Sequence, residues 1–160
     1  MTNYYHRSDT PVGPVLFVGT ADTVTAMYWE VFARTPAVGS GWVEDAAPFE
    51  EILRQLDEYF KGERQTFDVK YALTGTDFQK AVWRELECIP HGESSTYKAI
   101  AAAIGKPNAV RAVGTAVGSN PLSIIVPCHR VLTSNLGIGG YAGGIAAKQD
   151  LLNLENISFR

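Results

Sequence analysis

The amino-acid sequence predicts an α/β (α+β) protein of two domains. Its 160 residues, 46% hydrophobic and 19% charged, are enough to bury a core in one domain or in two small ones. In the first 73 residues, β-branched and aromatic segments surround one helical stretch, whereas residues 76–160 carry mainly short helical patterns. The change falls at Gly75, so we expect one domain at 1–75 and a second at 76–160.

Three strands are expected in the first third of the chain, where β-branched and aromatic residues cluster. They are residues 3–7, 15–19 and 24–32. A Pro-Val-Gly-Pro sequence at 11–14 supplies the turn between the first two. These segments gather no reactive side chains, so they predict a scaffold rather than a chemical site.

A helix and one more strand complete the expected first domain. Residues 35–48 are rich in Pro, Gly, Ala and Ser and predict a loop. Apolar residues then recur at helical spacing, and Gly62 is placed to end that helix. The apolar positions are Phe49, Ile52, Leu53, Leu56, Tyr59 and Phe60. Residues 67–73 then predict a strand.

Three short helices are expected at the start of the second domain. Thr76 and Gln79 form a capping-box pattern ahead of the first. Apolar residues at helical spacing over 97–104 predict the second, and Asn108 is a suitable N-cap for a third that ends near Gly118. Two short helices joined by a three- or four-residue turn are typical of a helix-turn-helix, although an ordinary αα-corner has the same pattern.

The third helix has one smooth face. Val110, Val113 and Val117 share a stripe that should face inward. The opposite stripe holds one cation among small residues, namely Arg111, Gly114, Thr115 and Gly118. Such a face would let a nucleic-acid backbone approach closely, or would serve helix–helix contact beside a solvated arginine. The net charge is −5 over residues 1–75 (6 Lys/Arg, 11 Asp/Glu) and +2 over 76–160 (8 against 6), which weakly favours a polyanion at the second domain.

Several classes of protein are excluded by what the sequence lacks. No uncharged apolar run approaches the roughly 20 residues of a membrane-spanning helix, and the first ten residues contain no apolar signal region. Two cysteines, Cys88 and Cys128, are too few for a disulfide framework or a Cys-rich zinc site. We therefore expect reduced thiols, a cytoplasmic location, no membrane partner and no metal.

The residues around Cys128 carry the chemistry. An isolated cysteine is usually a core residue, but here His129 follows directly and a Gly-rich segment comes next, which favours a reactive thiol. Adjacent side chains do not face each other on a helical turn, so a water-bridged relay is more natural than a direct Cys–His bond. Glu155 shares a helical stripe with two leucines and could orient the imidazole. The competing interpretation is that Glu155 only pairs with Lys148 on the same stripe.

Residues 127–131 (PCHRV), followed by residues 139–144 (GGYAGG), resemble the signature of the O6-alkylguanine-DNA alkyltransferases. Residues 111–114 (RAVG) and 120–121 (NP) stand at the spacing that this family shows ahead of its cysteine. The match runs from about residue 76 to residue 155. Residues 1–75 are similar to the family's N-terminal domain in layout and in the opening SDTPVGP. The resemblance implies a ribonuclease H-like first domain and a winged-helix-like second domain.

The resemblance also implies a role for each site residue. Cys128 would accept the alkyl group, His129 would act through water as its base, and Glu155 would orient His129. Tyr97 would donate a hydrogen bond to the leaving guanine, and Asn120 would brace the hinge before the cysteine. Arg111 would fill the hole left by a flipped nucleotide. The remaining implied DNA contacts are Thr96, Gly114, Thr115, Gly118 and Ser119, and the implied base pocket is Val131, Tyr141, Ala142 and Gly143.

The function implied is single-turnover repair of double-stranded DNA, with the alkyl group of O6-alkylguanine, and of O4-alkylthymine, moving to Cys128. No cofactor and no protein partner are required. Two alternatives belong to other classes: a lesion-binding module without transfer, and a thiol hydrolase with multiple turnover. One departure from the family pattern stands at Leu136, where a glycine often follows Ser-Asn. It concerns the conformation of the pocket loop and the acceptance of bulky alkyl groups.

Overall fold

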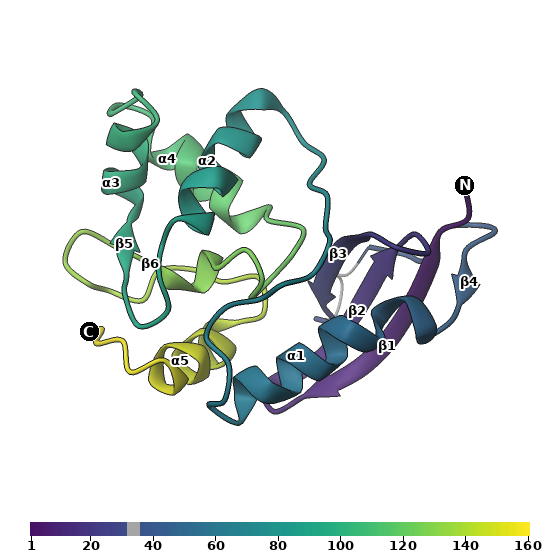
Figure 1. Ribbon diagram of the computed structural model, residues 1–160. Helices are drawn as coiled ribbons and strands as arrows, with labels where there is room; N and C mark the ends of the chain where they lie inside the picture. The colour runs from purple at the N-terminus through teal and green to yellow at the C-terminus, as the bar shows by residue number, and fades with distance from the viewer. Residues whose placement is uncertain (32–35) are drawn as a thin grey trace. The chain divides into compact units, whose positions relative to one another are not determined.

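The computed structural model describes residues 1–31 and 36–160, which divide into two compact units, Met1–Leu73 and Thr74–Arg160 (Figure 1). The first unit is a sheet with one long helix, and the second consists mainly of short helices. The predicted two-domain α/β class is confirmed. Among the described residues, no helix combines the length and apolar character needed to cross a membrane.

The first unit is built on a four-stranded sheet of order β3-β2-β1-β4. The strands are β1 (Tyr4–Thr10), β2 (Gly13–Gly19), β3 (Val24–Trp29) and β4 (Val43–Glu44). β2 lies antiparallel between β1 and β3, and its side chains from Val15 to Val18 are all buried, which explains its continuous apolar run. The third strand was expected to reach Phe32; it ends at Trp29, and Phe32 lies outside the described residues.

One helix covers this sheet. A 3₁₀ turn (Ala47–Phe49) leads into α1 (Glu50–Phe60). Phe49, at the end of that turn, stacks on Phe17 of β2, with ring centroids 5.7 Å apart. Gly62 follows the helix with φ 77°, the left-handed conformation that its role as a stop predicted. The expected loop at 35–48 is wrong in part, because β4 and the start of the 3₁₀ turn lie inside it.

The predicted strand at 67–73 does not form. The segment is extended, but it joins the sheet only by a single parallel bridge between Val24 and Tyr71. The buried side chain of Gln55 instead bonds to the backbone of this segment at Asp68. Gln55 Nε2 donates to the carbonyl of Asp68 at 2.9 Å, and the Asp68 N–H donates to Gln55 Oε1 at 2.8 Å. A side-chain amide thus replaces the strand ladder at this position.

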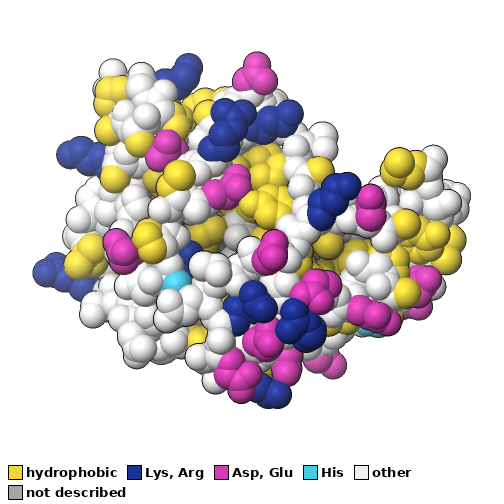
Figure 2. Space-filling model, in the orientation of Figure 1, with side chains coloured by type: hydrophobic (Ala, Val, Ile, Leu, Met, Phe, Trp, Pro, Cys, Tyr) yellow, Lys and Arg dark blue, Asp and Glu magenta, His cyan; other side chains and the backbone are white. Residues whose placement is uncertain are grey.

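The outer face of α1 is strongly charged. Arg54 pairs with Glu51 and Glu58, and Lys61 pairs with Asp57 at 2.9 Å. Figure 2 shows basic and acidic side chains interleaved over this part of the molecule. Exposed pairs of this kind are screened by water and salt, so they serve solubility more than stability.

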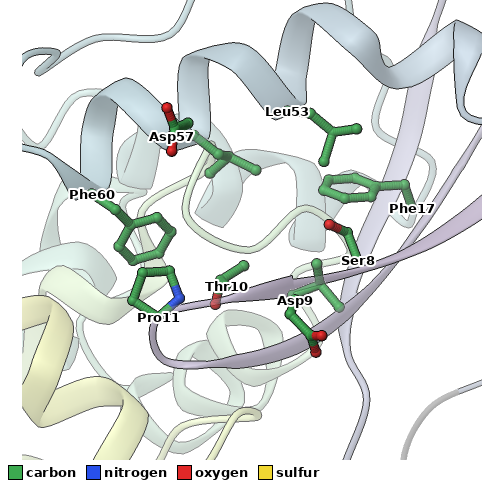
Figure 3. A pocket seen from close by; sticks show the side chains of 10 residues that line it. Ser8, Asp9, Thr10, Pro11, Phe17, Leu53, Asp57 and Phe60 are labelled. Carbon is green, nitrogen blue, oxygen red and sulfur yellow. The ribbon is translucent and has the colours of Figure 1, made fainter.

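A cavity of about 220 Å³ lies between α1 and the β1–β2 hairpin (Figure 3). Phe17, Leu53 and Phe60 contribute apolar side chains to it, and the lining residues also include Asp9 and Asp57. All of its lining residues belong to the first unit, so it contains none of the predicted site residues.

The second unit carries every predicted site residue. Its elements are α2 (Asp77–Glu87), β5 (Ser95–Thr96), α3 (Tyr97–Ala103), α4 (Val110–Gly118), a 3₁₀ turn (Cys128–Arg130), β6 (Val131–Leu132) and α5 (Ile145–Leu154). The capping box of Thr76 and Gln79 is present in full at α2, as predicted. Trp83 on α2 donates its indole N–H to the carbonyl of Ala116 on α4 at 2.9 Å, which ties these helices together.

The helix pair α3–α4 differs from expectation at its connection. The link runs from Ile104 to Ala109, longer than the expected turn, and Ala109 rather than Asn108 is the N-cap of α4. Lys106 and Ala109 close that link with a backbone bond, which places Asn108 inside a turn instead of at a helix start. Of the predicted inner stripe, Val113 and Val117 are buried, whereas Val110 is half-buried.

Candidate active site

Cys128 stands at the end of a buried segment that Asn120 holds in shape. Asn120 Nδ2 donates to the carbonyl of Val126 at 2.8 Å, and Asn120 Oδ1 accepts from the N–H of Leu122 at 3.0 Å. Within this brace, Ile124 has φ 70°, a strained conformation for a β-branched residue. The brace places Cys128 at the first position of the 3₁₀ turn with 5% of its surface exposed.

The thiol of Cys128 rests in the protonated form. Burial raises the pKa of Cys128 because the interior disfavours a thiolate, while a hydrogen bond from Asn120 and the charge of Lys148 lower it in part. A buried thiol with a raised pKa needs a nearby base at the moment of attack.

His129, the base that the family resemblance implied, has its imidazole buried beside a carboxylate. His129 Nε2 lies 2.6 Å from Glu155 Oε2, and both side chains have no exposed surface. Glu155 is the C-cap of α5, and its Oε1 also accepts from the N–H of Gly92 at 3.3 Å. The structure therefore joins two of the three residues that the sequence grouped into a relay, His129 and Glu155, and Cys128 directly precedes His129 in the same 3₁₀ turn.

Arg130 completes this cluster, and the sequence reasoning did not include it. Its Nε donates to Glu155 Oε1 at 2.7 Å and its Nη2 to Glu155 Oε2 at 3.2 Å. Its Nη1 donates to the carbonyl of Ile89 at 2.6 Å, which ties the cluster to the end of α2. A bidentate arginine fixes the plane of the carboxylate, and with it the orientation of His129. The one feature of the sequence that could have indicated a role for Arg130 is its position directly after His129.

The imidazole of His129 is held in its neutral form, with one ring nitrogen that has no hydrogen-bond partner. Burial lowers the pKa of His129, and the charge of Arg130 adds to this, while the bond and charge of Glu155 oppose it. The imidazole is therefore neutral at rest. With its Nε2 hydrogen given to Glu155, the other ring nitrogen is an acceptor, and Nδ1 is the one buried side-chain polar atom of the described residues without a hydrogen-bond partner.

Lys148 is a second buried cation close to the thiol. Its Nζ donates to the carbonyl of Val131 at 2.6 Å and to that of Gly140 at 3.2 Å. Burial lowers the pKa of Lys148 to about 8, while the charge of a Cys128 thiolate raises it. The suggested pairing of Glu155 with Lys148 is wrong: Arg130 is the cation bonded to Glu155, and Lys148 holds the backbone on both sides of the pocket loop.

Tyr97 reaches this site through a short parallel pairing that joins distant parts of the chain. Ser95 and Thr96 in β5 pair with Val131 and Leu132 in β6, so Tyr97 emerges beside the segment that follows Cys128. Burial raises the pKa of Tyr97, and a thiolate at Cys128 raises it further. The phenol is therefore a firm hydrogen-bond donor at neutral pH.

The residues expected to contact DNA lie on α4 and at the start of α3. Arg111 and Thr115 are exposed on α4, and Gly118 has open space where a side chain would be. Gly114 faces Tyr97, with 3.8 Å between its virtual Cβ and the ring. Two other expected contacts have local bonds: Thr96 caps α3 by accepting from the N–H of Ala99, and Ser119 Oγ donates to the carbonyl of Ala116.

Comparison with known proteins decides the family. Residues 77–157 match the family model "6-O-methylguanine DNA methyltransferase, DNA binding domain", and residues 3–73 match "6-O-methylguanine DNA methyltransferase, ribonuclease-like domain". The chain belongs to the 6-O-methylguanine DNA methyltransferase family. The resemblance found in its sequence is thereby confirmed.

Individual relatives of this family cover almost the whole chain. A methylated-DNA–protein-cysteine methyltransferase of Methanosarcina barkeri is 44% identical and covers 98% of this chain and 99% of the relative. The constitutive enzyme of Bacillus subtilis is 43% identical, with 99% and 98% covered. The crystal structure of Mycobacterium tuberculosis OGT in complex with DNA is 44% identical, with a TM-score of 0.87 over 95% of this chain and 92% of that one.

The base-pocket residues implied by the family resemblance follow the cysteine turn and precede α5. Val131 is fully buried and is held by Lys148, and Tyr141 is 9% exposed. Ala142 and Gly143 are half-buried in the turn before α5. Leu136, where the family resemblance implied a glycine, adopts φ 64°, a left-handed conformation that glycine favours and leucine adopts at a cost.

No cluster suited to a metal ion was found in residues 1–31 and 36–160, where three or more His, Cys, Asp or Glu side chains nowhere converge.

Proposed function

We propose that this chain repairs alkylated double-stranded DNA by moving the alkyl group from O6 of guanine, or O4 of thymine, to Sγ of Cys128 in a single turnover. One observation carries the proposal: the buried Cys128 is followed by His129, whose Nε2 is bonded to Glu155 and whose Nδ1 is left without a partner. The names of the relatives, methylated-DNA–protein-cysteine methyltransferases, support the same reaction.

The transfer requires two proton movements that balance. His129 Nδ1 takes the thiol proton through a water, and the Glu155 carboxylate stabilises the imidazolium. Sγ attacks the alkyl carbon, so that an S–C bond forms as the C–O bond breaks and the electron pair passes into the guanine ring. A hydrogen bond from the phenol of Tyr97 helps the guanine gain a proton and leave neutral. In the net reaction, the leaving guanine gains one proton and the thiol of Cys128 loses one, so the transfer balances.

The product explains why the protein acts once. The bond formed is a thioether, whose saturated carbon offers water no activated carbonyl to attack. A thiol hydrolase depends on a thioester that water can cleave, and on an oxyanion hole that stabilises its formation. The site residues needed for transfer are all supplied by the chain, so the proposal requires no cofactor and no protein partner.

DNA must present the base outside its stack, because in-line attack on an O6-alkyl carbon is blocked within the duplex. Flipping costs a few kcal/mol, which phosphate contacts and an inserted side chain have to offset. The exposed Arg111, on a helix face otherwise made of small residues, suits insertion from the minor groove. Two free cysteines, one of them exposed, agree with a reducing compartment, and we place the protein in the cytoplasm.

The decisive experiment is a titration of the protein with duplex DNA that contains O6-methylguanine, followed by intact-mass spectrometry. The proposal predicts one added methyl group per protein molecule and no further turnover. Binding without added mass would identify a lesion-binding module, and product in excess of protein would identify a hydrolase. Either result would replace the proposal.

Replacing Arg111 with alanine is expected to slow transfer from duplex substrate by roughly tenfold or more, because a flipped base is then no longer replaced in the stack. Transfer from free O6-benzylguanine should change less than about twofold, since no base has to be held out. Second-order rate constants on both substrates provide the measurement. The matched control is Lys106→Ala, which removes a different cation, in the link between α3 and α4. Equal losses on both substrates would show that Arg111 supports the fold instead.

A further inference from the structure

The chain beyond Glu155 folds back onto the loop that follows the cysteine. Asn156 turns in the left-handed conformation with φ 59°, and the N–H of Ile157 donates to the carbonyl of Leu152 at 2.9 Å. Ile157 is 6% exposed and forms a core cluster with Leu132 and Leu152. Ile138 of the loop and Phe159 of the terminal segment both pack against this cluster. In Figure 1 the terminal segment is the yellow stretch of chain that follows α5 and ends at the label C.

A backbone hydrogen bond joins the end of this segment to the loop. The N–H of Arg160 donates to the carbonyl of Leu136 at 2.8 Å. Leu136 lies in a tight turn, in which its own N–H donates to the carbonyl of Thr133 and the N–H of Thr133 donates to the carbonyl of Gly137, both at 2.9 Å. The turn therefore moves as a unit, and the bond from Arg160 holds that unit from outside.

Leu136 cannot hold the turn by its own burial. Its side chain is 43% exposed, and its φ of 64° is a conformation that leucine adopts at a cost. A turn that contains such a residue relaxes easily unless another contact fixes its backbone. The carbonyl of Leu136 is the group that Arg160 fixes.

The turn leads directly to the segment that faces Tyr97. Gly139 has φ 67°, and a Cβ placed on it would lie 2.9 Å from the Tyr97 hydroxyl oxygen, so the backbone there passes close to the phenol. The next carbonyl, that of Gly140, accepts from Lys148. In the other direction along the chain, the terminal segment begins right after Glu155, the carboxylate bonded to His129. The terminal segment, through its hydrogen bond to Leu136, thus links the end of the relay to the loop that passes Tyr97.

We propose that residues 157–160 form a C-terminal strap that positions the 133–140 loop against Tyr97 and so sets the size of alkyl group the site accepts. This inference rests on the proposed function, because it assigns a specificity role within the same reaction. With the strap attached, the backbone at Gly139 stays close to Tyr97 and the site suits a methyl group. With the strap released, the turn at Leu136 relaxes and the space near Tyr97 widens, which favours bulkier alkyl groups.

The hydrogen bond from the Arg160 N–H to Leu136 can be removed without removing another contact that the structure gives for Arg160. Arg160→Pro deletes the backbone N–H, whereas the matched control Arg160→Ala removes the side chain and keeps the donor. We expect Arg160→Pro to raise the ratio of the benzyl to the methyl transfer rate, measured on duplexes with O6-benzylguanine and O6-methylguanine, by about fivefold, as the loss of one ordinary hydrogen bond gives. Arg160→Ala should leave this ratio within about twofold of the wild type.

Two further measurements separate positioning from general loss of stability. Hydrogen exchange of the Leu136 and Thr133 amides should speed up in Arg160→Pro but not in Arg160→Ala, while Tm stays unchanged in both. Phe159→Ala, which loosens the strap through its packing, should move the rate ratio in the same direction as Arg160→Pro. An equal ratio in the proline and alanine variants, or a ratio that moves only together with Tm, overturns the strap. If the wild-type protein transfers neither alkyl group, the proposed function itself fails.

Discussion

Cys128→Ser is expected to abolish alkyl transfer, with a loss on the order of a thousandfold or more. A serine hydroxyl is far less acidic than a thiol, and its oxygen is a poorer nucleophile toward a saturated carbon. Because Cys128 is only 5% exposed and its neighbours are held by Asn120, the smaller serine should fit without disturbing the fold. The affinity for duplex DNA that contains O6-methylguanine should therefore stay close to that of the wild type.

The matched control for this prediction is the other cysteine. Cys88 is exposed at the end of α2, where its thiol donates to the carbonyl of Arg84 at 3.3 Å, and no base is bonded to it. Cys88→Ser should retain the full stoichiometry of one alkyl group per chain. Peptide mapping after reaction should find the added mass on the peptide that contains Cys128. Added mass on the Cys88 peptide, or residual transfer by Cys128→Ser, would remove Cys128 from its role.

Patterns with local causes were readable from the sequence. The capping box at Thr76 and the stop at Gly62 depend on neighbouring residues alone, and both occur as predicted. The His129–Glu155 contact was assigned through the family resemblance, and the hydrogen bond between these two side chains is present. The capping box and the helix stop need no knowledge of how distant segments meet.

What the sequence missed depends on contacts between distant segments. The β5–β6 pairing has two residues in each strand, too few for any periodic pattern, yet it brings Tyr97 beside the cysteine turn. Arg130 and Lys148 are almost fully buried, although charged residues belong on the surface by composition alone. Their hydrogen bonds to carbonyl groups far along the chain make that burial possible.

The false strand at 67–73 has the same kind of cause. Its residues suit a strand, but a single buried amide, that of Gln55, bonds to Asp68 and takes over the backbone groups that would otherwise pair with a neighbouring strand. A glutamine between Arg54 and Leu56 in the sequence does not indicate this role. Local preference was therefore overruled by one tertiary contact.

Glu155→Gln is expected to slow transfer by at least tenfold near neutral pH and to lower the melting temperature. The relay loses the charge that stabilises the imidazolium of His129, so proton transfer from the thiol becomes harder. Activity should return as the pH rises, because the thiol can then ionise without the imidazole, although burial keeps its pKa raised. The pH–rate profile therefore moves to higher pH.

The loss of stability has a separate origin, so the two effects need separate controls. Glu155→Gln leaves Arg130 buried without its anionic partner, and breaking a buried pair in this way costs about 3–5 kcal/mol. Arg130→Met breaks the same pair from the other side but keeps the carboxylate on His129. It should lower Tm by a similar amount, and its pH–rate profile should not move to higher pH, because the positive charge that disfavours the imidazolium is gone. Melting curves and pH–rate profiles of both variants make the comparison. If both variants lose stability and both keep the wild-type profile, Glu155 only supports the fold, and the reaction depends on Cys128 and His129 without it.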